Sequence, residues 1–546
     1  MRASDLFVKT LEQEGVTYMF GLPGEENLML LDSIRTSSIR FILTRHEQAA
    51  GFMAATVGKL TGELATCLST LGPGATNLMT AVAYSQLGGM PVLFITGQKP
   101  VKKSKQGHFQ VINTVEMMRP LTKLTKQIIH AQVIPSLIRN CVKLAKEERP
   151  GAVHLELPED VAAEKADDIL QYVPIYTRRP VAEKKAVERA IAMIEKAKRP
   201  LILVGAGANR KRTSNMLTTF IEKTRIPFFT TQMGKGVVDE RSEQYLGTAA
   251  LSENDYLHCA IDKSDLIINV GHDIIEKPPF IMRPTDKRAV IHINFFPAVL
   301  DPIYSPQLEV IGDIANTVWQ IEQNITPQKT WDFTYFKRIR KHLLQHIANV
   351  PSSYPYSPQQ IVEAVRNQQK DDDITVLDNG MFKIWFARNY QTRKENTLLL
   401  DNVLATMGAG LPCAIAAKLI KPHRNVIAVT GDGGFMMNAQ ELETALRLKL
   451  HITVLVLKDN AYGMIRWKQE NMGLTNFGLD FSNPDFVALA QSFGAQGHRV
   501  EKIGDLEKLL DFCARQKTVH VIELPVDYTH NKRVLIDELR KKTCEL

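Results

Sequence analysis

The sequence predicts an α/β protein made of three doubly wound domains, each built on a parallel sheet. A chain of 546 residues is too long for one hydrophobic core, so two to four domains are expected. Short apolar runs alternate with segments of helical spacing, which is typical of parallel strands joined by crossover helices. One such run ends at Gly431-Asp432-Gly433-Gly434, where the pattern predicts that a strand turns into a helix.

The domain limits follow from where this alternation is interrupted. A polar stretch with prolines at 174 and 180 is typical of a linker, and we assign it to residues 172–185. The last residues are charged and are expected to form a surface tail or a short helix. We therefore place an N-terminal domain at 1–170, a central domain at 186–340, a C-terminal domain at 355–530 and a tail at 531–546.

Short stretches of consecutive residues predict the individual helices and strands. The central domain should open with a helix at 186–198 and a strand at 201–204, and the C-terminal domain with a strand at 374–377. Residues 402–417 lack charges, but their shortness, two glycines and a proline indicate a buried helix and no membrane span. In the N-terminal domain we expect strands at 18–20, 39–44, 65–69, 92–96 and 153–156.

Composition narrows the class of protein. The formal net charge of +8 is modest and scattered, without the basic and aromatic face that nucleic-acid binding needs, and it suits anionic substrates. The N-terminal segment carries charges and shows no signal peptide, so we expect a cytoplasmic protein. The six cysteines show no CxxC pair and are expected to be isolated reduced thiols; they stand at 67, 141, 259, 413, 513 and 544.

Residues 426–463 carry the strongest chemical signal. They predict strand, tight turn, helix and strand, with Asp432 and Asp459 each following a strand. The carboxyl ends of parallel strands are where ligands bind in such sheets. Gly431, Gly433 and Gly434 let the backbone approach a phosphate at a helix N-terminus, and two carboxylates suit Mg²⁺. The stretch therefore predicts a metal–diphosphate site.

This stretch resembles the thiamine-diphosphate signature, in which GDG is followed after a fixed span by Asn-Asn. Without the resemblance, a GDGG turn or an Asp-Asn strand end would be ordinary loop structure. The resemblance implies Mg²⁺ ligands from Asp432, Asp459 and the backbone carbonyl of Ala461. Most of the family has asparagine at Asp459, so this chain adds a negative charge beside the diphosphate. Further cofactor contacts are implied for the three glycines and for Tyr462, Gly463 and Met464.

The same resemblance assigns roles in the N-terminal domain. Local pattern alone would make Glu47 a helix-start glutamate favoured by the helix dipole. In the resembling enzymes a glutamate in this context shares a proton with N1′ of the aminopyrimidine, which gives Glu47 a catalytic role. Gly74 and Asn77, in the loop LGPGATN, are expected near that ring, and Gln110 near the bound intermediate.

In the C-terminal domain the resemblance implies two further contacts. Met407, which by general statistics would be a core methionine, is expected under the cofactor, bending it so that its exocyclic nitrogen reaches C2. Asp378, Asn379 and Gly380 follow a predicted strand and are expected at the diphosphate. Lys383 stands near the place where we expect a histidine-like residue.

RHEQAA, STLGPGATN, TMGAGLP and GDGGFMMNAQELETA together resemble the acetolactate (acetohydroxyacid) synthases. These enzymes decarboxylate pyruvate on the thiamine-diphosphate ylide and add the hydroxyethyl carbanion to a second 2-oxo acid. Two alternatives stay open: another thiamine-diphosphate decarboxylase, carboligase or lyase, and a cofactor-binding protein without activity. Gly24-Glu25-Glu26 departs from many members, and an acidic side chain there would disfavour a second anionic substrate.

The resemblance also bears on cofactors and partners. Leu157-Pro158-Glu159 and Gly271-His272-Asp273 differ from the stretches typical of flavin-binding members, so the flavin-independent, catabolic branch is favoured over an FAD enzyme. The cofactor is expected between subunits of a homodimer or homotetramer. The substrate is expected to be pyruvate or another 2-oxo acid. A regulatory subunit is left open, and neither nucleic acid nor membrane is expected as a partner.

Overall fold

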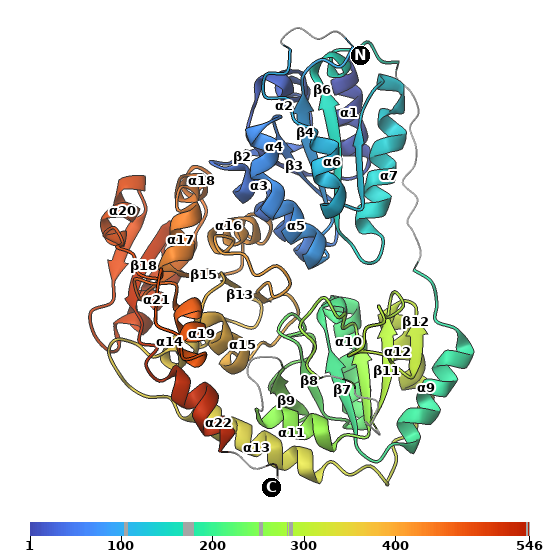
Figure 1. Ribbon diagram of the computed structural model, residues 1–546, viewed down its shortest axis with the longest axis vertical. Coiled ribbons are helices and arrows are strands. Elements are labelled where there is room, and N and C mark those ends of the chain that lie inside the picture. The colour runs from blue at the N-terminus through green and yellow to red at the C-terminus, as the bar shows by residue number, and fades with distance from the viewer. Residues whose placement is uncertain are drawn as a thin grey trace.

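The computed structural model describes residues 1–102, 107–167, 179–249, 255–280, 282, 288–541 and 544. Within them the first domain is a parallel sheet of six strands in the order β2-β1-β3-β4-β6-β5 (Figure 1). The five predicted strands are confirmed. β5 was missed because its sequence, LTKQ, has no apolar run. The strands are β1 Tyr18–Gly21, β2 Arg40–Leu43, β3 Ala65–Ser69, β4 Val92–Gln98, β5 Leu124–Gln127 and β6 Ala152–Pro158.

Both faces of this sheet are covered, as a parallel sheet requires. Helices α3 (Glu47–Thr61) and α5 (Met79–Gly88) pack on one face, and α1 (Ala3–Gln13) and α7 (Ile134–Lys146) on the other. The central strands β3 and β4 are buried along their whole length for this reason.

The third domain repeats the strand order of the first, as β14-β13-β15-β16-β18-β17, again all parallel. Because the first and third domains share one strand order, they are consistent with an old duplication of a single domain. The predicted strand 374–377 is confirmed. The strands are β13 Ile374–Leu377, β14 Leu398–Leu399, β15 Val426–Gly431, β16 Ile452–Lys458, β17 Gln496–Arg499 and β18 Val519–Pro525.

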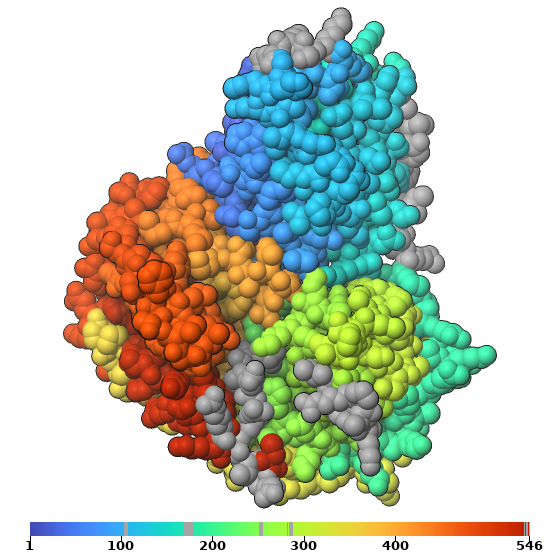
Figure 2. All heavy atoms as spheres, in the orientation of Figure 1, coloured from blue at the N-terminus to red at the C-terminus, as the bar shows by residue number. Residues whose placement is uncertain are grey.

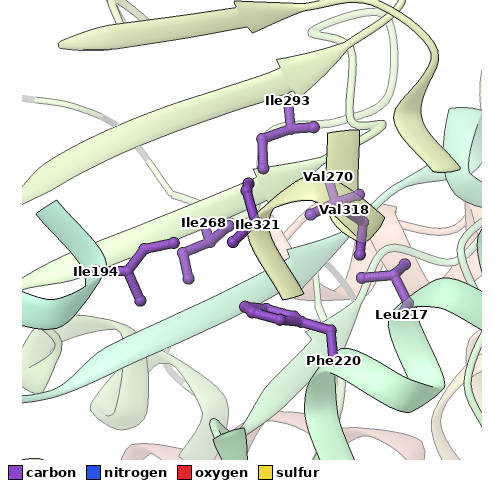
Figure 3. Close-up of a pocket in the computed structure, with 8 residues that line it drawn as sticks. All are labelled: Ile194, Leu217, Phe220, Ile268, Val270, Ile293, Val318 and Ile321. Carbon is purple, nitrogen blue, oxygen red and sulfur yellow. The ribbon is translucent and has the colours of Figure 1, made fainter. Parts of the chain in front are cut away.

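The middle domain has a different sheet, ordered β12-β11-β10-β7-β8-β9. Read from β9 this is the 3-2-1-4-5-6 order of dinucleotide-binding folds, with its switch point between β7 and β10. Helices α9 (Lys184–Lys196), α10 (Lys211–Thr224) and α12 (Ile314–Asn324) enclose only a small void of about 10 Å³ against the sheet (Figure 3). The strands are β7 Pro200–Val204, β8 Phe228–Thr230, β9 Tyr245–Thr248, β10 Leu266–Val270, β11 Ala289–Asn294 and β12 Leu308–Ile311.

The three domains contact one another (Figure 2). Helix α3 of the first domain packs on α16 (Gly410–Ile420) of the third, and one apolar core spans both domains. The middle domain is joined to the third by paired backbone and side-chain bonds between Glu240 and Thr392. It is joined to the first by an Arg210–Glu148 ion pair.

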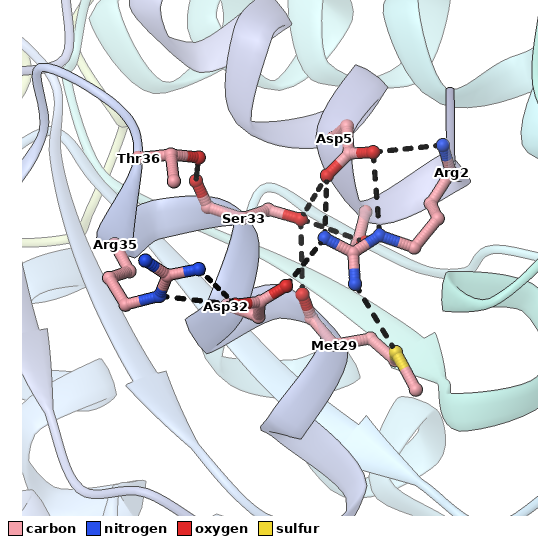
Figure 4. A network of polar contacts seen from close by, with 8 residues as sticks. Arg2, Asp5, Met29, Asp32, Ser33, Arg35 and Thr36 are labelled. Carbon is pink, nitrogen blue, oxygen red and sulfur yellow. Dashed lines mark hydrogen bonds and ion pairs between the residues drawn. The ribbon is translucent and has the colours of Figure 1, made fainter.

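The chain start is tied to the first domain by the polar network of Figure 4. Arg2 lies between Asp5 on α1 and Asp32 on α2 (Leu28–Arg35), and Arg35 pairs with Asp32 from the other side. Ser33 donates to the Asp5 carboxylate at 2.6 Å. These partners lower the pKa of Asp5 to about 2 against the opposing effect of its burial, so the network stays charged at neutral pH.

Four sequence-based expectations need correction or limits. The helix predicted at 402–417 begins only at Gly410, because the preceding residues form an irregular segment with positive φ at Ala405 and Gly408. The single helix predicted after Gly431 is two helices, α17 (Asp432–Asn438) and α18 (Glu441–Arg447). Half of the predicted linker, 172–178, lies outside the described residues. The tail is not only surface, since Val534 and Leu535 are buried against the third domain.

The prediction of six isolated thiols is wrong for two of them. Cys259 on α11 (Tyr256–Lys263) and Cys544 form a disulfide, whereas Cys67, Cys141, Cys413 and Cys513 are free and buried. The pair is separated by 285 residues, so no local spacing could indicate it. None of the helices in the described parts of the chain has the length and hydropathy that a membrane crossing requires.

Candidate active site

The GDGG turn organises one edge of the third sheet. β15 ends at Gly431 and α17 begins at Asp432, while the neighbouring strand β16 ends at Lys458, just before Asp459. Asp432 Oδ2 accepts hydrogen bonds from the backbone N–H of Asp459 at 3.2 Å and of Asn460 at 2.7 Å. The Nδ2 group of Asn483 donates to the same oxygen at 2.8 Å. The two predicted metal ligands are therefore brought to one place by adjacent parallel strands.

The donor set at this edge fits a hard cation. Burial first, and then the negative charge of Asp432, raise the pKa of Asp459 to about 7. Burial also raises the pKa of Asp432. Asp432 is buried and Asp459 half-buried, and a cation would stabilise the ionised form of both carboxylates. Carboxylate and carbonyl oxygens are the ligands that Mg²⁺ prefers. The Ala461 carbonyl, the third predicted ligand, accepts the N–H of Gly463 at 3.0 Å.

The glycines leave room that side chains would remove. A Cβ at Gly463 would lie 2.7 Å from Asp459 Oδ2, and one at Gly434 would lie 2.5 Å from Asp378 Oδ2. At Gly433 a Cβ would lie 3.0 Å from the Tyr462 ring, whereas at Gly431 it would meet only Phe382 at 3.6 Å. A side chain at Gly433, Gly434 or Gly463 would therefore have to displace Tyr462, Asp378 or Asp459, respectively.

Asp378 and Asn379 support the loop that carries Met407, whereas Gly380 lies beside the Phe382 ring. Asp378 Oδ2 accepts the N–H of Gly408 at 3.0 Å, and Asn379 Nδ2 donates to the carbonyl of Thr406 at 2.6 Å. Burial raises the pKa of Asp378 to about 6. The half-buried Met407 is therefore held from both sides, and the contacts of Asp378 and Asn379 explain the loop without a diphosphate.

Lys383, where a histidine-like residue was expected, belongs to the same support. Its Nζ donates to Asn379 Oδ1 at 2.5 Å and to the carbonyl of Asp401 at 2.9 Å. Burial lowers the pKa of Lys383 to about 8. The Asp401 carboxylate in turn accepts the N–H of Ala405 at 2.7 Å.

The segment that begins at Tyr462 is more exposed to solvent than Asp432 and Asp459. The Tyr462 ring packs against the Phe481 ring in a tilted arrangement, with ring centroids 5.0 Å apart. Met464, on α19 (Gly463–Asn471), packs partly against the domain core. Apolar side chains on α19 and the following loop point to solvent in one chain; they are Ile465, Met472, Leu474 and Phe477.

Glu47 lies at the first residue of α3, in a second cluster of predicted residues. Asn77 Nδ2 donates to Glu47 Oε2 at 3.0 Å, and a Cβ at Gly74 would lie 3.4 Å from Oε1. Gln110 is exposed, and its carbonyl would be 2.9 Å from a Cβ at Gly72 in the same loop. The structure thus brings Glu47, Gly74 and Asn77 together and places Gln110 along the edge of their loop.

The acidic residues at 25 and 26 differ in their surroundings. Glu26 is buried and pairs with Lys99 Nζ at 2.6 Å, while Thr70 donates to its other oxygen. Although burial raises it, the Lys99 and Thr70 bonds hold the pKa of Glu26 below its usual range. Glu25 is exposed. The charge of Glu26 is therefore compensated within the domain.

Within the described residues no hydrogen bond or ion pair joins Glu47 to Asp432; instead, α17 and α18 connect their surroundings. α17 starts at Asp432 and ends at Asn438, whose Nδ2 donates to Gln48 Oε1 at 3.3 Å. Buried Glu441 accepts the N–H of Arg45 at 3.0 Å. Asp432 and Asn438 are six residues apart along α17, which corresponds to about 9 Å along the helix axis. Sequence reasoning missed Glu441 and Asn483, whose partners are distant in the chain.

The middle domain closes its own switch point. The glycine turn after β7 packs against the loop after β10, so a Cβ at Gly205 would lie 2.3 Å from His272 Cα. Glu276 fills this turn: its carboxylate accepts the N–H of Ala206 at 2.9 Å and the hydroxyl of Thr231 at 2.6 Å. An amide that could face a phosphate is therefore already bonded to a carboxylate of the chain.

Glu276 should give stability a measurable pH dependence. Burial raises the pKa of Glu276 from 4.5 to about 7, so the folded chain keeps this proton after the unfolded chain has lost it. The free energy of unfolding should fall by about 3 kcal/mol as pH rises from the unfolded to the folded pKa. Glu276→Gln does not titrate: its amide oxygen can accept the N–H of Ala206, while its NH₂ group donates to the Thr231 hydroxyl oxygen in the reverse direction. Its melting temperature relative to the wild type should therefore be higher at pH 8 than at pH 5.

The matched control is Glu188→Gln on the exposed face of α9, where Glu188 lies 3.7 Å from Lys184. This variant should show no comparable change between the two pH values. An equal shift in both variants, or none for Glu276→Gln, would contradict the role of burial.

Comparison with known proteins identifies the class of all three domains. The chain matches the thiamine pyrophosphate enzyme N-terminal TPP binding domain over residues 1–117 and the central domain over 187–321. It matches the C-terminal TPP binding domain over 378–524. Fold and site together therefore define a thiamine pyrophosphate enzyme.

Full-length relatives define the family within this class. The acetolactate synthase of Bacillus subtilis (strain 168) is 32% identical, with 100% of this chain and 96% of the relative covered. The catabolic acetolactate synthase of Raoultella terrigena is also 32% identical, with 97% and 95% covered. The acetolactate synthase isozyme 2 large subunit of Escherichia coli (strain K12) is 27% identical, with 97% and 96% covered. The chain belongs to the acetolactate synthase family.

Proposed function

We propose that the protein condenses two molecules of pyruvate to 2-acetolactate and CO₂, using thiamine diphosphate and Mg²⁺. The observation that carries this proposal is the pairing of Asp432 with Asp459 at the GDGG edge, in a chain whose Glu47 occupies the first turn of α3. Thiamine diphosphate, when bound, supplies the electron sink for decarboxylation and carbon–carbon bond formation.

The chain's residues then have distinct tasks. Asp432, Asp459 and the Ala461 carbonyl hold Mg²⁺ against the diphosphate. Glu47, oriented by Asn77, holds the proton that N1′ of the aminopyrimidine shares. Met407, on the loop supported by Asp378 and Asn379, would supply an apolar support for the cofactor. Gln110 borders the bound substrate.

The acceptor is a second 2-oxo acid. Because Lys99 compensates the buried Glu26, this carboxylate does not present an uncompensated negative charge to an anionic acceptor, whereas Glu25 beside it is exposed. An alternative is another carboligase or lyase reaction on the same scaffold, acting on different 2-oxo acids or 2-hydroxy ketones.

The assay uses the full-length protein with thiamine diphosphate, Mg²⁺ and pyruvate. We expect pyruvate consumption that depends on both cofactors and a product that yields acetoin after acid treatment. Consumption without an acetoin-forming product would favour the alternative and call for a panel of 2-oxo acids. No turnover of any member of that panel by loaded protein would overturn the proposal.

We propose further that turnover does not need FAD, because Glu276 occupies the glycine turn at the switch point of the middle domain. Added FAD should leave the rate unchanged, and the purified protein should show no visible flavin absorbance. Stimulation by FAD would contradict this.

The active unit is proposed to be at least a dimer, in which Glu47 of one copy and Asp432 of the other serve one cofactor. The absence of a described contact between them within one chain supports this, as do the apolar side chains exposed on α19 and its loop.

A further inference from the structure

A second group of residues whose side chains commonly bind metals lies at β17, the edge strand of the third sheet. One ligand atom each from His498, Cys513 and His520 lie within 4.8 Å of one another. The residues come from three elements: β17, α21 (Asp505–Arg515) and β18. None of them belongs to the site built around Asp432.

The sheet register explains why they meet. Gln496 pairs with His520, and His498 pairs with Ile522, so the two histidines stand two positions apart across a parallel pair and share a face. Their rings approach with His498 Nε2 and His520 Nδ1 at 3.0 Å. Helix α21 covers this face and brings Cys513 beside them, while Phe512 packs edge-on against both rings.

The surroundings restrict these side chains before any ligand arrives. His520 and Cys513 are buried, whereas His498 is half-buried and leaves access from solvent. The Nε2 atom of His520 is buried and has no hydrogen-bond partner in the described part of the chain. Because Nδ1 of His520 faces His498, Nδ1 is the nitrogen available to a ligand shared with His498, and Nε2 is the nitrogen that carries the proton.

We propose that His498, Cys513 and His520 bind one zinc-like transition-metal ion. Imidazole nitrogen and thiolate sulfur are the ligands that Zn²⁺ selects, and without a carboxylate or carbonyl the set does not suit Mg²⁺. The 3.0 Å separation of the two nitrogens is close to that of neighbouring ligands on a tetrahedral ion with bonds of about 2.0 Å. A water molecule completes the fourth position from the side of His498.

Binding changes protons but transfers no electrons. The Cys513 thiol loses its proton to solvent as the metal–sulfur bond forms. The two imidazoles exchange their mutual hydrogen bond for one bond each to the metal, and the proton between them moves to a ring nitrogen that faces away. The ion then links the edge strand β17 to β18 and α21, so its effect is on the stability of this edge.

The test measures zinc in the full-length, chelator-treated protein kept with Mg²⁺ and thiamine diphosphate. Titration against a chromogenic zinc chelator should show one ion per chain, and Co²⁺ should give the near-ultraviolet absorbance of a metal–thiolate bond. His498→Gln, at the half-exposed ligand, should weaken zinc binding by about 100-fold or more, since an open three-residue site loses one ligand. Cys513→Ser should also remove the cobalt–thiolate band.

Two controls make the result specific. Cys141→Ser alters another buried thiol, in the first domain, and His130→Gln an exposed histidine; both should keep full zinc binding. Pyruvate turnover should stay at the wild-type level in His498→Gln and verifies folding. A stoichiometry near zero, or unchanged zinc affinity in both His498→Gln and Cys513→Ser, would overturn the proposal.

Discussion

Replacing Glu47 with glutamine is expected to reduce acetolactate formation by about 100-fold or more, because general acid–base catalysis contributes about 10²- to 10⁴-fold. The amide can still accept the hydrogen bond that Asn77 gives to Glu47 Oε2, so the local geometry should be kept. It cannot exchange a proton with the aminopyrimidine nitrogen. Binding of thiamine diphosphate should change little, because the diphosphate and metal contacts lie in the other domain.

The measurement is kcat for acetolactate together with the thiamine diphosphate Kd from quenching of protein fluorescence. Glu63→Gln is the control: Glu63 follows the far end of α3 and pairs with Lys146 at the surface. It should behave as the wild type. A Glu47→Gln enzyme with a kcat within about tenfold of the wild type would refute the catalytic role of this carboxylate.

Asp432→Ala is expected to abolish Mg²⁺-dependent binding of the cofactor. The substitution removes a metal ligand and also the oxygen that accepts hydrogen bonds from Asp459, Asn460 and Asn483. Each buried N–H group left without an acceptor costs about 1–3 kcal/mol, so the loop after β16 should lose its order as well. We expect at least about a 100-fold weaker response to Mg²⁺, which corresponds to roughly 3 kcal/mol.

Two variants separate charge from ligation in this prediction. Asp480→Ala removes an exposed carboxylate that pairs with Arg466 near the same loop, and it should leave Mg²⁺ dependence unchanged. Asp459→Asn keeps an oxygen ligand and removes the extra negative charge, so its Mg²⁺ affinity should stay within about tenfold of the wild type. Equal losses in all three variants would show that loop disorder, and not metal ligation, causes the effect.

Mixing the two inactive variants tests the shared site. If each cofactor uses Glu47 of one copy and Asp432 of another, a mixed dimer has one intact site and one site with both defects. Random exchange of Glu47→Gln and Asp432→Ala subunits should therefore recover about a quarter of the wild-type activity. No recovery after verified subunit exchange would place both residues in a site formed by one chain.

Much of the fold could be predicted because its signals are local. The five strands predicted in the first domain and the strand at 374–377 are short apolar runs, and apolar runs are a property of consecutive residues. β5 escaped because an edge strand such as LTKQ is only half covered and needs no apolar run. The break between α17 and α18 escaped for a related reason: Asn438 makes its bonds to Gly408 and Gln48, which local spacing does not reveal.

The same distinction between local signals and distant contacts applies to the candidate site. The sequence alone determined that Asp432 and Asp459 follow adjacent strands, because the glycine turn and the next apolar run lie within one strand–helix–strand unit. Only the tertiary structure decided which distant groups complete that unit. Asn483 is 51 residues from Asp432, Glu441 is 396 residues from Arg45, and the disulfide partners are 285 residues apart. Such contacts depend on how finished elements pack, and packing is not encoded in the spacing of neighbouring residues.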